Sequence, residues 1–304
     1  MKFGLASIIG RPNVGKSTLM NGLIGTKISI VSDKPQTTRA RILGVLNQPD
    51  VQIVFVDTPG IHRPGHRLNE RMMAEVEEAM REVDLLLHMV DASERLGKGE
   101  KFVLEMVRSV EARKFLLLNK VDKINKAKVL PMIESFSEEG IYDEIFPLSA
   151  LTGENVDLLL ETMVRYLPEG QPMYPPEYLT NQNERFLVAE IIREKVLHHT
   201  RQELPYTTAV LIEEFDESKR EEGFVRITAS ILVEKDGQKK IVIGRGGKVV
   251  KQIGIEARQE IETLLQVRQI FLGLNVKVEP GWRNKEPLLD ALGVGWGRSG
   301  TEVS

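Results

Sequence analysis

The sequence predicts two domains, an α/β domain with a mostly parallel sheet followed by a smaller α+β domain. In the first half of the chain, short apolar runs alternate with helical patterns, as they do where helices connect parallel strands. After a proline-rich stretch, the order changes to helix, two strands, a glycine-rich turn, helix and strand. A length of 304 residues also suits two domains, because single hydrophobic cores rarely grow to that size.

The composition excludes several classes of protein. The absence of cysteine excludes disulfides and thiolate metal sites, and it indicates a reducing compartment. No apolar run is long enough to span a membrane, and the apolar start leads directly into a structured motif, so we expect neither a span nor a signal peptide. A net charge of −3 is unlike that of a strongly basic nucleic-acid binder. Nucleic acid would therefore have to bind a local patch, and residues 235–251 form the one dense basic cluster.

The first domain is expected over residues 1–168. Its apolar runs are rich in Val, Ile and Leu, which is typical of strands buried on both faces. The predicted strands cover residues 3–9, 51–57, 84–90 and 114–119, and the predicted helices cover residues 16–25, 71–83 and 99–112. Ligands of such sheets bind at the carboxyl ends of the strands, and the motifs of this domain all fall there.

A phosphate-binding loop follows the first predicted strand. The stretch "GRPNVGKST" matches the pattern G-x-x-x-x-G-K-[ST], and it lies between a strand and a helix. Its glycines allow backbone N–H groups to surround phosphates, Lys16 would reach the β- and γ-phosphates, and Ser17 would bind Mg²⁺. The residues expected to contact the nucleotide here are Gly10, Asn13, Val14, Gly15, Lys16, Ser17 and Thr18.

Two further segments complete the predicted phosphate and metal site. "VFVDTPG" provides Asp57 for the metal, through water, and Gly60, whose N–H can contact the γ-phosphate. Thr38 lies in an aperiodic segment, residues 32–42, which would be ordered when its hydroxyl joins the Mg²⁺ shell and released after hydrolysis; an ordinary polar turn is the alternative. The expected catalytic residues are Lys16, Thr38 and Gly60, and the expected metal ligands are Ser17, Thr38 and Asp57.

The base is predicted to be guanine. In "LLLNKVD", the carboxylate of Asp122 can accept from N1–H and N2–H of guanine, and adenine offers neither donor in that arrangement. Lys120 can lie along the base, and Asn119 can tie this loop to the phosphate loop. "SAL", with Ser149, Ala150 and Leu151, would present a backbone N–H to guanine O6. The four motifs in this order indicate GTP and GDP as the ligands.

The chain departs from many GTPases at a position that takes part in hydrolysis. The residue after Gly60 is Ile61, where many GTPases have a glutamine that orients the attacking water. An isoleucine cannot orient water, and the neighbouring His62 is more simply read as a solvated loop residue. We therefore expect slow intrinsic hydrolysis, with the water held by the backbone, by metal ions or by a partner.

The glycine-rich turn of the second domain is predicted to bind RNA. Gly244–Gly247 reads G-x-x-G and fails the patterns of a second phosphate loop and of a dinucleotide fingerprint. We expect it between a strand end, "IVI", and a helix, as in KH modules that clamp about four nucleotides of single-stranded backbone. Ile241 and Ile243 would line a groove for the bases; a glycine hairpin on a solvated edge is the alternative. The expected RNA-binding residues are Lys240, Ile243, Gly244, Arg245, Gly246, Gly247 and Lys248.

Over nearly its whole length the chain resembles the Era family of bacterial GTPases. The resemblance rests on "GRPNVGKST", "SDKPQTTR", "DTPGIH", "NKVD" and "SAL", and on the linker, "ELPY" and "DGQKKIVIGRGG", which are specific to that family when found together. It implies a P-loop GTPase domain over residues 1–168, a linker over 169–182, a type II KH domain over 183–280 and a tail over 281–304.

The resemblance also implies partners and a location. It implies binding to single-stranded 16S rRNA near its 3′ end, a role in assembly of the small ribosomal subunit, and a cytoplasmic location with peripheral contact to the inner face of the cell membrane. Family members share the missing glutamine, and an asparagine at the place of Asn13 helps related GTPases hold K⁺. A monomer is expected, and no protein partner can be deduced.

Two alternatives remain open on the sequence. The first is a non-enzymatic RNA-binding assembly scaffold for which GTP is a structural ligand, an alternative that Ile61 supports. Multiple turnover stimulated by RNA would exclude it. The second is a GTPase of tRNA modification or membrane traffic, which shares the first domain but would not depend on the glycine turn.

Overall fold

The computed structural model describes residues 1–34, 36–61, 65–81, 83–95, 97–200 and 204–294. The chain divides into two compact units, each with its own sheet. Unit 1 contains Met1–Ser29, Thr38–Pro64 and Met72–Asn181, and unit 2 contains Ile30–Thr37, Gly65–Arg71 and Gln182–Ser304. Two short segments from the first part of the sequence, residues 30–37 and 65–71, thus belong to unit 2.

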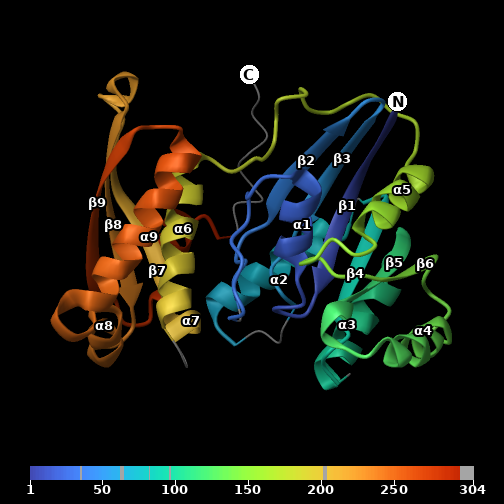
Figure 1. The fold of residues 1–304 in the computed structure, drawn as a ribbon. Helices are drawn as coiled ribbons and strands as arrows, with labels where there is room; N and C mark the ends of the chain where they lie inside the picture. The colour runs from blue at the N-terminus through green and yellow to red at the C-terminus, as the bar shows by residue number, and fades with distance from the viewer. Residues whose placement is uncertain (35, 62–64, 82, 96, 201–203, 295–304) are drawn as a thin grey trace. The chain divides into compact units, whose positions relative to one another are not determined.

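Unit 1 is built on a six-stranded sheet with the strand order β2-β3-β1-β4-β5-β6 (Figure 1). β2 is antiparallel to β3, and the other neighbours are parallel, so the predicted mostly parallel sheet is confirmed. The strands are β1 (Lys2–Gly10), β2 (Ile42–Gln48), β3 (Val51–Asp57), β4 (Leu85–Asp91), β5 (Arg113–Asn119) and β6 (Glu144–Pro147). β1 lies between β3 and β4, where the strand order reverses, and ligands of such sheets bind at the carboxyl ends of the strands beside this point.

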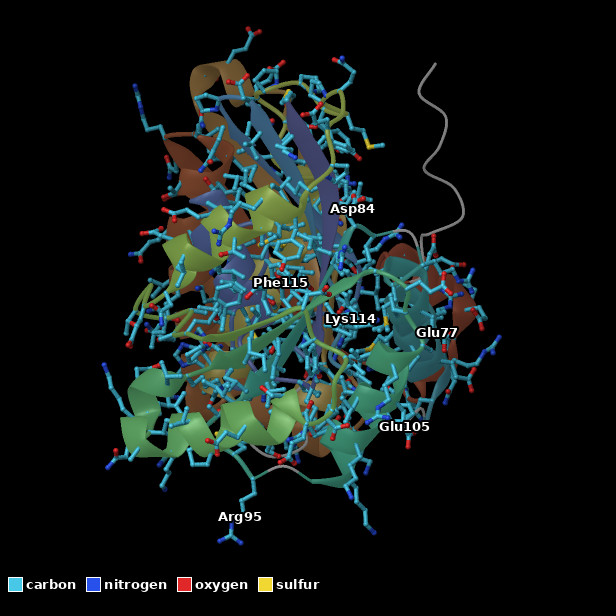
Figure 2. The ribbon with its side chains drawn as sticks, turned by 90° about the vertical axis from the view of Figure 1, so that its right-hand side faces the viewer. Glu77, Asp84, Arg95, Glu105, Lys114 and Phe115 are labelled. Atoms are coloured by element: carbon cyan, nitrogen blue, oxygen red, sulfur yellow. The ribbon has the colours of Figure 1, made fainter. Side chains whose placement is uncertain are left out.

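The predicted strands match four of these six to within two residues at each end. All seven residues of β3 and of β4 are buried, which explains their mostly apolar character. Figure 2 shows Asp84 just before β4, where its Oδ2 accepts a hydrogen bond of 2.8 Å from Leu5 N and joins β4 to β1. The sequence reasoning did not single out β2, which is of mixed polarity, or β6, which is only four residues long.

Helices cover both faces of this sheet. The ring of Phe115 on β5 contacts Tyr166 of α5 with centroids 5.0 Å apart, whereas the adjacent Leu116 packs with Phe136 of α4. Successive strand residues point to opposite faces, so α4 and α5 lie on opposite sides. The helices are α1 (Lys16–Ile24), α2 (Arg67–Ala79), α3 (Lys98–Arg108), α4 (Val129–Ser137) and α5 (Val156–Tyr166), with short 3₁₀ turns η1 (Val121–Lys123) and η2 (Lys126–Lys128).

The proline-rich segment after α5 lies along the edge strand β2. Leu179 O accepts from Val45 N at 2.9 Å, and Gly44 forms an isolated antiparallel bridge with Thr180. Gln52, which is 1% exposed, holds the backbone of Tyr174 through both its side-chain atoms, with Nε2 donating to the carbonyl at 2.7 Å and Oε1 accepting from the amide at 3.0 Å. This segment therefore acts as a further partner of β2 without forming a regular strand.

Unit 2 contains a three-stranded sheet of order β7-β8-β9, in which β7 is antiparallel and β9 is parallel to β8. Helices α6 and α9 lie side by side (Figure 1), and their apolar residues share one core with the strands. The elements are α6 (Glu184–His199), α7 (Leu204–Thr207), β7 (Ala209–Asp216), η3 (Arg220–Glu222), β8 (Phe224–Val233), α8 (Asp236–Ile243), η4 (Arg245–Gly247), α9 (Lys248–Leu265), β9 (Gln269–Val278), η5 (Trp282–Asn284) and α10 (Glu286–Ala291).

Two local predictions for unit 2 were wrong. "IVI" is the end of helix α8 and not of a strand, because β8 already ends at Val233 and a helix begins at Asp236, where Gln238 Oε1 accepts from the amide of Lys235 at 3.1 Å. The first strand of this domain, predicted over residues 206–214, begins at 209, because Leu204–Thr207 forms a helical turn. The glycine turn therefore connects two helices.

The C-terminal segment contributes to the core of unit 2. The side chain of Trp282 is completely buried, and its Nε1 donates to Thr207 O at 2.8 Å. The second tryptophan of the predicted tail, Trp296, lies outside the described residues. None of the helices formed by the described residues is both long enough and apolar enough to span a membrane.

Replacing Gln52 should release the proline-rich segment from the sheet. We expect Gln52→Leu to lower the free energy of unfolding by about 1–3 kcal/mol, because it removes three hydrogen bonds between the buried amide of Gln52 and the backbone of Met173 and Tyr174. Urea denaturation measures the stability, and hydrogen exchange at the Tyr174 amide measures the release. The control is Gln48→Leu at an exposed position of the adjoining strand β2, and an equal loss in both variants would contradict the expectation.

Candidate nucleotide-binding site and RNA interface

The phosphate loop lies between β1 and α1, at the carboxyl end of β1. Gly15 is the N-cap of α1 and has no side chain, so the N-cap residue supplies no acceptor for the first amides of this helix. A helix N-terminus of this kind attracts anions because its free N–H groups and its dipole are both positive. The loop residues predicted from the sequence are thus placed where a phosphate would bind.

Gly15 cannot be replaced without displacing the guanine loop. A Cβ atom at this position would lie 2.2 Å from Nδ2 of Asn119, and the backbone has a φ of +110°, which side-chain-bearing residues rarely adopt. The close approach exists because Asn119 Nδ2 donates to the neighbouring carbonyl of Val14 at 2.7 Å. The phosphate loop and the guanine loop are therefore in direct contact.

Lys16 lies inside the phosphate loop. Its Nζ donates to the carbonyls of Gly10 and Arg11, at 3.3 and 3.0 Å, and its side chain is buried. Burial lowers the pKa of Lys16 to about 8, although the carboxylates of Asp57 and Glu100 act in the opposite direction. A phosphate beside Nζ would favour the charged form and restore a full positive charge at the place where the β- and γ-phosphates are expected.

The three predicted metal ligands come together around the carboxylate of Asp57. Ser17 Oγ donates to Asp57 Oδ2 at 2.7 Å, and Thr38 Oγ1 lies 2.9 Å from Ser17 Oγ and 3.4 Å from the same carboxylate oxygen. A fourth residue, Ser29, donates to Oδ2 at 2.9 Å. These side chains are all buried, and they come from four different segments of the chain.

This group of oxygens fits Mg²⁺. Asp57 Oδ1 is buried and has no hydrogen-bond partner among the described residues, so half of the carboxylate is left for a ligand. Burial raises the pKa of Asp57, although Lys16 and three hydroxyls act in the opposite direction, and a divalent cation would favour the charged carboxylate. Hydroxyl and carboxylate oxygens with water are the ligands that Mg²⁺ prefers. Ser17, Thr38 and Asp57 would hold the ion.

Gly60 and Ile61 have different surroundings. Gly60 lies against the phosphate loop, where a Cβ atom would be 2.7 Å from Pro12 Cα. Ile61 is 3% exposed and packs in the core with Ile9 and Val76, and its amide donates to Gly10 O at 3.0 Å. The side chain at the position of the usual glutamine is therefore a core residue. His62 lies outside the described residues.

The guanine loop follows β5. Asn119 connects three loops, because its Nδ2 donates to Val14 O and its Oδ1 accepts from Ala150 N at 2.9 Å. Asp122 is exposed, and no described residue forms a hydrogen bond to its carboxylate. The predicted residues Ser149, Ala150 and Leu151 lie on the loop that Asn119 holds. A purine edge could thus meet Asp122 and the 149–151 loop together.

The side chain of Lys120 is fixed by two contacts of its ammonium group. Its backbone is left-handed, with φ of 66°, and its Nζ donates to Asn13 O of the phosphate loop at 2.6 Å and to Asp91 Oδ2 at 2.5 Å. The sequence reasoning did not identify Asp91 or Ser29. A signal for Asp91 was available, since an acidic residue ends the buried strand β4 at the edge that carries the other motifs. Ser29 has no comparable signal.

The glycine turn of unit 2 leaves an open surface. Gly246 and Gly247 have φ of +63° and +75°, and a Cβ atom on either would meet no heavy atom within 4 Å. At Gly244, in contrast, a Cβ atom would be 2.4 Å from Val249, so this glycine is required by packing. Gly247 is also the N-cap of α9 and, having no side chain, supplies no cap to that helix. The predicted basic residues Lys240, Arg245 and Lys248 are exposed around this turn.

Comparison with known proteins identifies the family. A model described as 50S ribosome-binding GTPase matches residues 6–120, and a KH domain model matches residues 203–283. GTPase Era of Heliobacterium modesticaldum is 48% identical over 293 residues, which are 96% of this chain and 97% of that protein. The chain belongs to the GTPase Era family. GTPase Era of Alkaliphilus metalliredigens is 46% identical over 292 residues, 96% of this chain and 98% of that protein.

Solved Era structures have the same fold. A crystal structure of Era in complex with MgGDPNP and nucleotides 1506–1542 of 16S ribosomal RNA matches with a TM-score of 0.92 and 41% identity, covering 97% of this chain and 99% of that chain. A variant of Aquifex aeolicus Era bound to GDP and AlF4⁻ matches with a TM-score of 0.91 and 40% identity at the same coverage. The predicted combination of a P-loop GTPase domain and a KH domain is therefore confirmed.

A methyl group at Gly15 should disturb the contact between the phosphate loop and the guanine loop, and with it GDP binding. We expect Gly15→Ala to weaken GDP binding about tenfold or more, because the new Cβ atom must push Asn119 away and overpacking costs about 1–3 kcal/mol. Isothermal titration with GDP measures the effect. Gly22→Ala in α1 is the control, since its Cβ atom would meet nothing within 4 Å, and it should stabilise the helix by about 0.5–1 kcal/mol. Normal GDP binding by Gly15→Ala would refute the expected contact.

Proposed function

We propose that this Era-family chain is a GTP-hydrolysing switch that binds single-stranded 16S rRNA near its 3′ end and acts in assembly of the small ribosomal subunit. The convergence of Ser17, Thr38 and Asp57 on one metal position is the observation that carries the switch. The relative with MgGDPNP and an rRNA fragment, at 41% identity, supports the choice of ligands. We assign residues 1–168 to the GTP-binding domain, 169–182 to the linker, 183–280 to the KH domain and 281–304 to the tail.

In this proposal the residues of unit 1 bind GTP in distinct roles. Lys16 holds the β- and γ-phosphates, and the amide of Gly60 holds the γ-phosphate. Asn119, Lys120 and Asp122 hold and select guanine. Mg²⁺ bound by Ser17, Thr38 and Asp57 would neutralise negative charge on the phosphates. The further nucleotide contacts come from Gly10, Asn13, Val14, Gly15, Thr18, Ser149, Ala150 and Leu151.

Hydrolysis requires a water-positioning group other than residue 61. Because the Ile61 side chain is in the core, the attacking water must be oriented by backbone groups, a cation or a partner. We propose slow intrinsic turnover, with K⁺ beside Asn13 as a second cation. Equal hydrolysis rates in K⁺ and Na⁺ would argue against the K⁺ site.

The segment before Thr38 is held by helix α6. Within unit 2, Arg193 is 2% exposed and donates to the carbonyls of Gln36, at 3.2 Å, and of Thr37. Glu194 Oε1 accepts from Val31 N at 2.9 Å. Thr38, the proposed metal ligand, is the next residue along the chain. A change in the position of residues 30–38 on loss of the γ-phosphate would therefore act on α6 of the KH domain.

The RNA would bind at the glycine turn. The open glycines Gly246 and Gly247 allow a phosphate to approach the backbone, and the N-terminus of α9 supplies amides and a positive dipole. Lys240, Arg245 and Lys248 would neutralise further phosphates, and Ile243 would contact a base. The strand-end position expected for Ile243 is wrong, but as the last residue of α8 it still adjoins the turn.

The scaffold alternative makes a different prediction about turnover. A scaffold would bind GTP without multiple turnover, whereas the switch hydrolyses GTP repeatedly and faster with RNA. Steady-state phosphate release with and without a 16S rRNA 3′-end oligonucleotide distinguishes the two. The absence of turnover under both conditions would overturn the proposed switch.

We also propose partners and a location on the family resemblance. They are the small ribosomal subunit, a monomeric state, and a cytoplasmic location with peripheral contact to the inner face of the membrane. Sedimentation with ribosomal subunits and fractionation of cells after a salt wash test these points. Recovery only in the salt-resistant membrane fraction would contradict peripheral contact.

Replacing Arg193 should uncouple RNA affinity from the nucleotide. For the intact chain we expect RNA affinities with a non-hydrolysable GTP analogue and with GDP to differ about 5- to 150-fold. Arg193→Met should bring this ratio close to one, because the carbonyls of residues 36 and 37 lose their donor. Fluorescence anisotropy with a labelled RNA measures both affinities. Arg185→Met, on an exposed turn of the same helix, is the control, and an unchanged ratio in Arg193→Met would exclude this coupling.

A carboxylate in the glycine turn should weaken RNA binding through its charge. Gly246→Asp should lower RNA affinity more than tenfold, because it sets a negative charge against phosphate. Gly246→Asn is the matched control, since asparagine has nearly the same shape and also tolerates a positive φ. Filter binding at two salt concentrations measures the difference. Equal affinities of the two variants would show that charge at the turn does not matter.

A further inference from the structure

Asp91 has no role in the binding scheme described so far, although it lies within the nucleotide site. It is the last residue of β4 and pairs in register with Asn119, the last residue of β5. Its side chain is 5% exposed, and the next amide, Ala92 N, donates to Asn119 O at 2.9 Å. Figure 2 shows Arg95, from the loop after β4, extending away from the molecule. Asp91 is thus a buried carboxylate at the edge of the sheet where the motifs meet.

Both oxygens of Asp91 are engaged, each in a different task. Oδ1 accepts from Ser93, from the amide at 2.9 Å and from the hydroxyl at 2.6 Å, and these bonds set the orientation of the carboxylate. Oδ2 accepts from Lys120 Nζ at 2.5 Å. Burial raises the pKa of Asp91, but the hydrogen bonds from Lys120 and Ser93 outweigh it and hold the pKa below its usual value. The carboxylate is therefore charged where it contacts Lys120.

Lys120 needs such a partner for two reasons. Its backbone is left-handed, a conformation that persists at a non-glycine residue when the surroundings hold it. Its side chain is long and would otherwise lose considerable conformational freedom on binding a ligand. With Nζ held by Asp91 and by Asn13 O, the methylene stem is fixed between the guanine loop and the phosphate loop.

We propose that Asp91 is a positioning residue for guanine-nucleotide binding, which fixes the stem of Lys120 as a preformed surface for the base. The proposal rests on the nucleotide site proposed above. Asp91 touches no nucleotide, and it acts only through Lys120. In this proposal the stem contacts the face of the base, and Asp122 forms the hydrogen bonds to its edge. Asp91 therefore affects the affinity for the nucleotide but not the preference for guanine over hypoxanthine.

The test uses the nearly isosteric Asp91→Asn. The amide keeps an acceptor for Ser93 but removes the charge that holds Lys120. We expect the variant to bind GDP about 5- to 30-fold more weakly and to bind IDP more weakly by the same factor. The melting temperature without nucleotide should be unchanged. Ser93→Ala is the control, since it removes the hydroxyl bond to Oδ1 but keeps the amide bond and the charge that holds Lys120, and it should weaken GDP binding much less than Asp91→Asn.

A double-mutant cycle separates positioning from a structural role. In a Lys120→Met background, Asp91→Asn should cause no further loss of GDP affinity. Three results would overturn the inference: an additive loss in the double variant, a lower melting temperature without nucleotide at unchanged GDP affinity, or a changed GDP-to-IDP ratio. Failure of the wild-type chain to bind GDP would instead overturn the proposed nucleotide site, and with it this inference.

Discussion

The nucleotide site depends on one buried carboxylate oxygen, Asp57 Oδ2. A charged group without water must be compensated by hydrogen bonds or by a cation, and three hydroxyls supply part of this compensation. Ser17, Ser29 and Thr38 belong to separate segments, so satisfying the carboxylate brings residues 29 and 38 to the carboxyl end of β3. The positions of these residues and the occupancy of the metal site are therefore linked by the same group.

The parallel sheet explains why the remaining motifs meet. β1, β3, β4 and β5 run in the same direction, so the residues that follow each of them lie at one edge of unit 1. Asn119 and Lys120 then join the loops to one another through carbonyls of the phosphate loop. A ligand that fills this edge meets loops already held in place, which reduces the entropy lost on binding.

The features that could be predicted from the sequence are those determined by local residue spacing and by burial. Strands buried on both faces, such as β3 and β4, and loops with glycines at required positions have patterns that single-chain reasoning can recognise. The helical state of "IVI" could not be recognised, because β-branched residues favour strands and the side chain that caps the start of α8, Gln238, lies several residues earlier. Partners distant in sequence, such as Ser29 with Asp57 or Arg193 with residue 37, leave no local pattern at all.

The proline-rich segment along β2 has a consequence for association between copies of the chain. An edge strand exposes unpaired amides and carbonyls, which can template pairing with another molecule and start aggregation. Leu179 and Thr180 occupy part of the edge of β2, and the nearby prolines cannot donate to an incoming strand. The connection between the domains thus also protects the chain against aggregation, a role that is independent of GTP binding and of RNA binding.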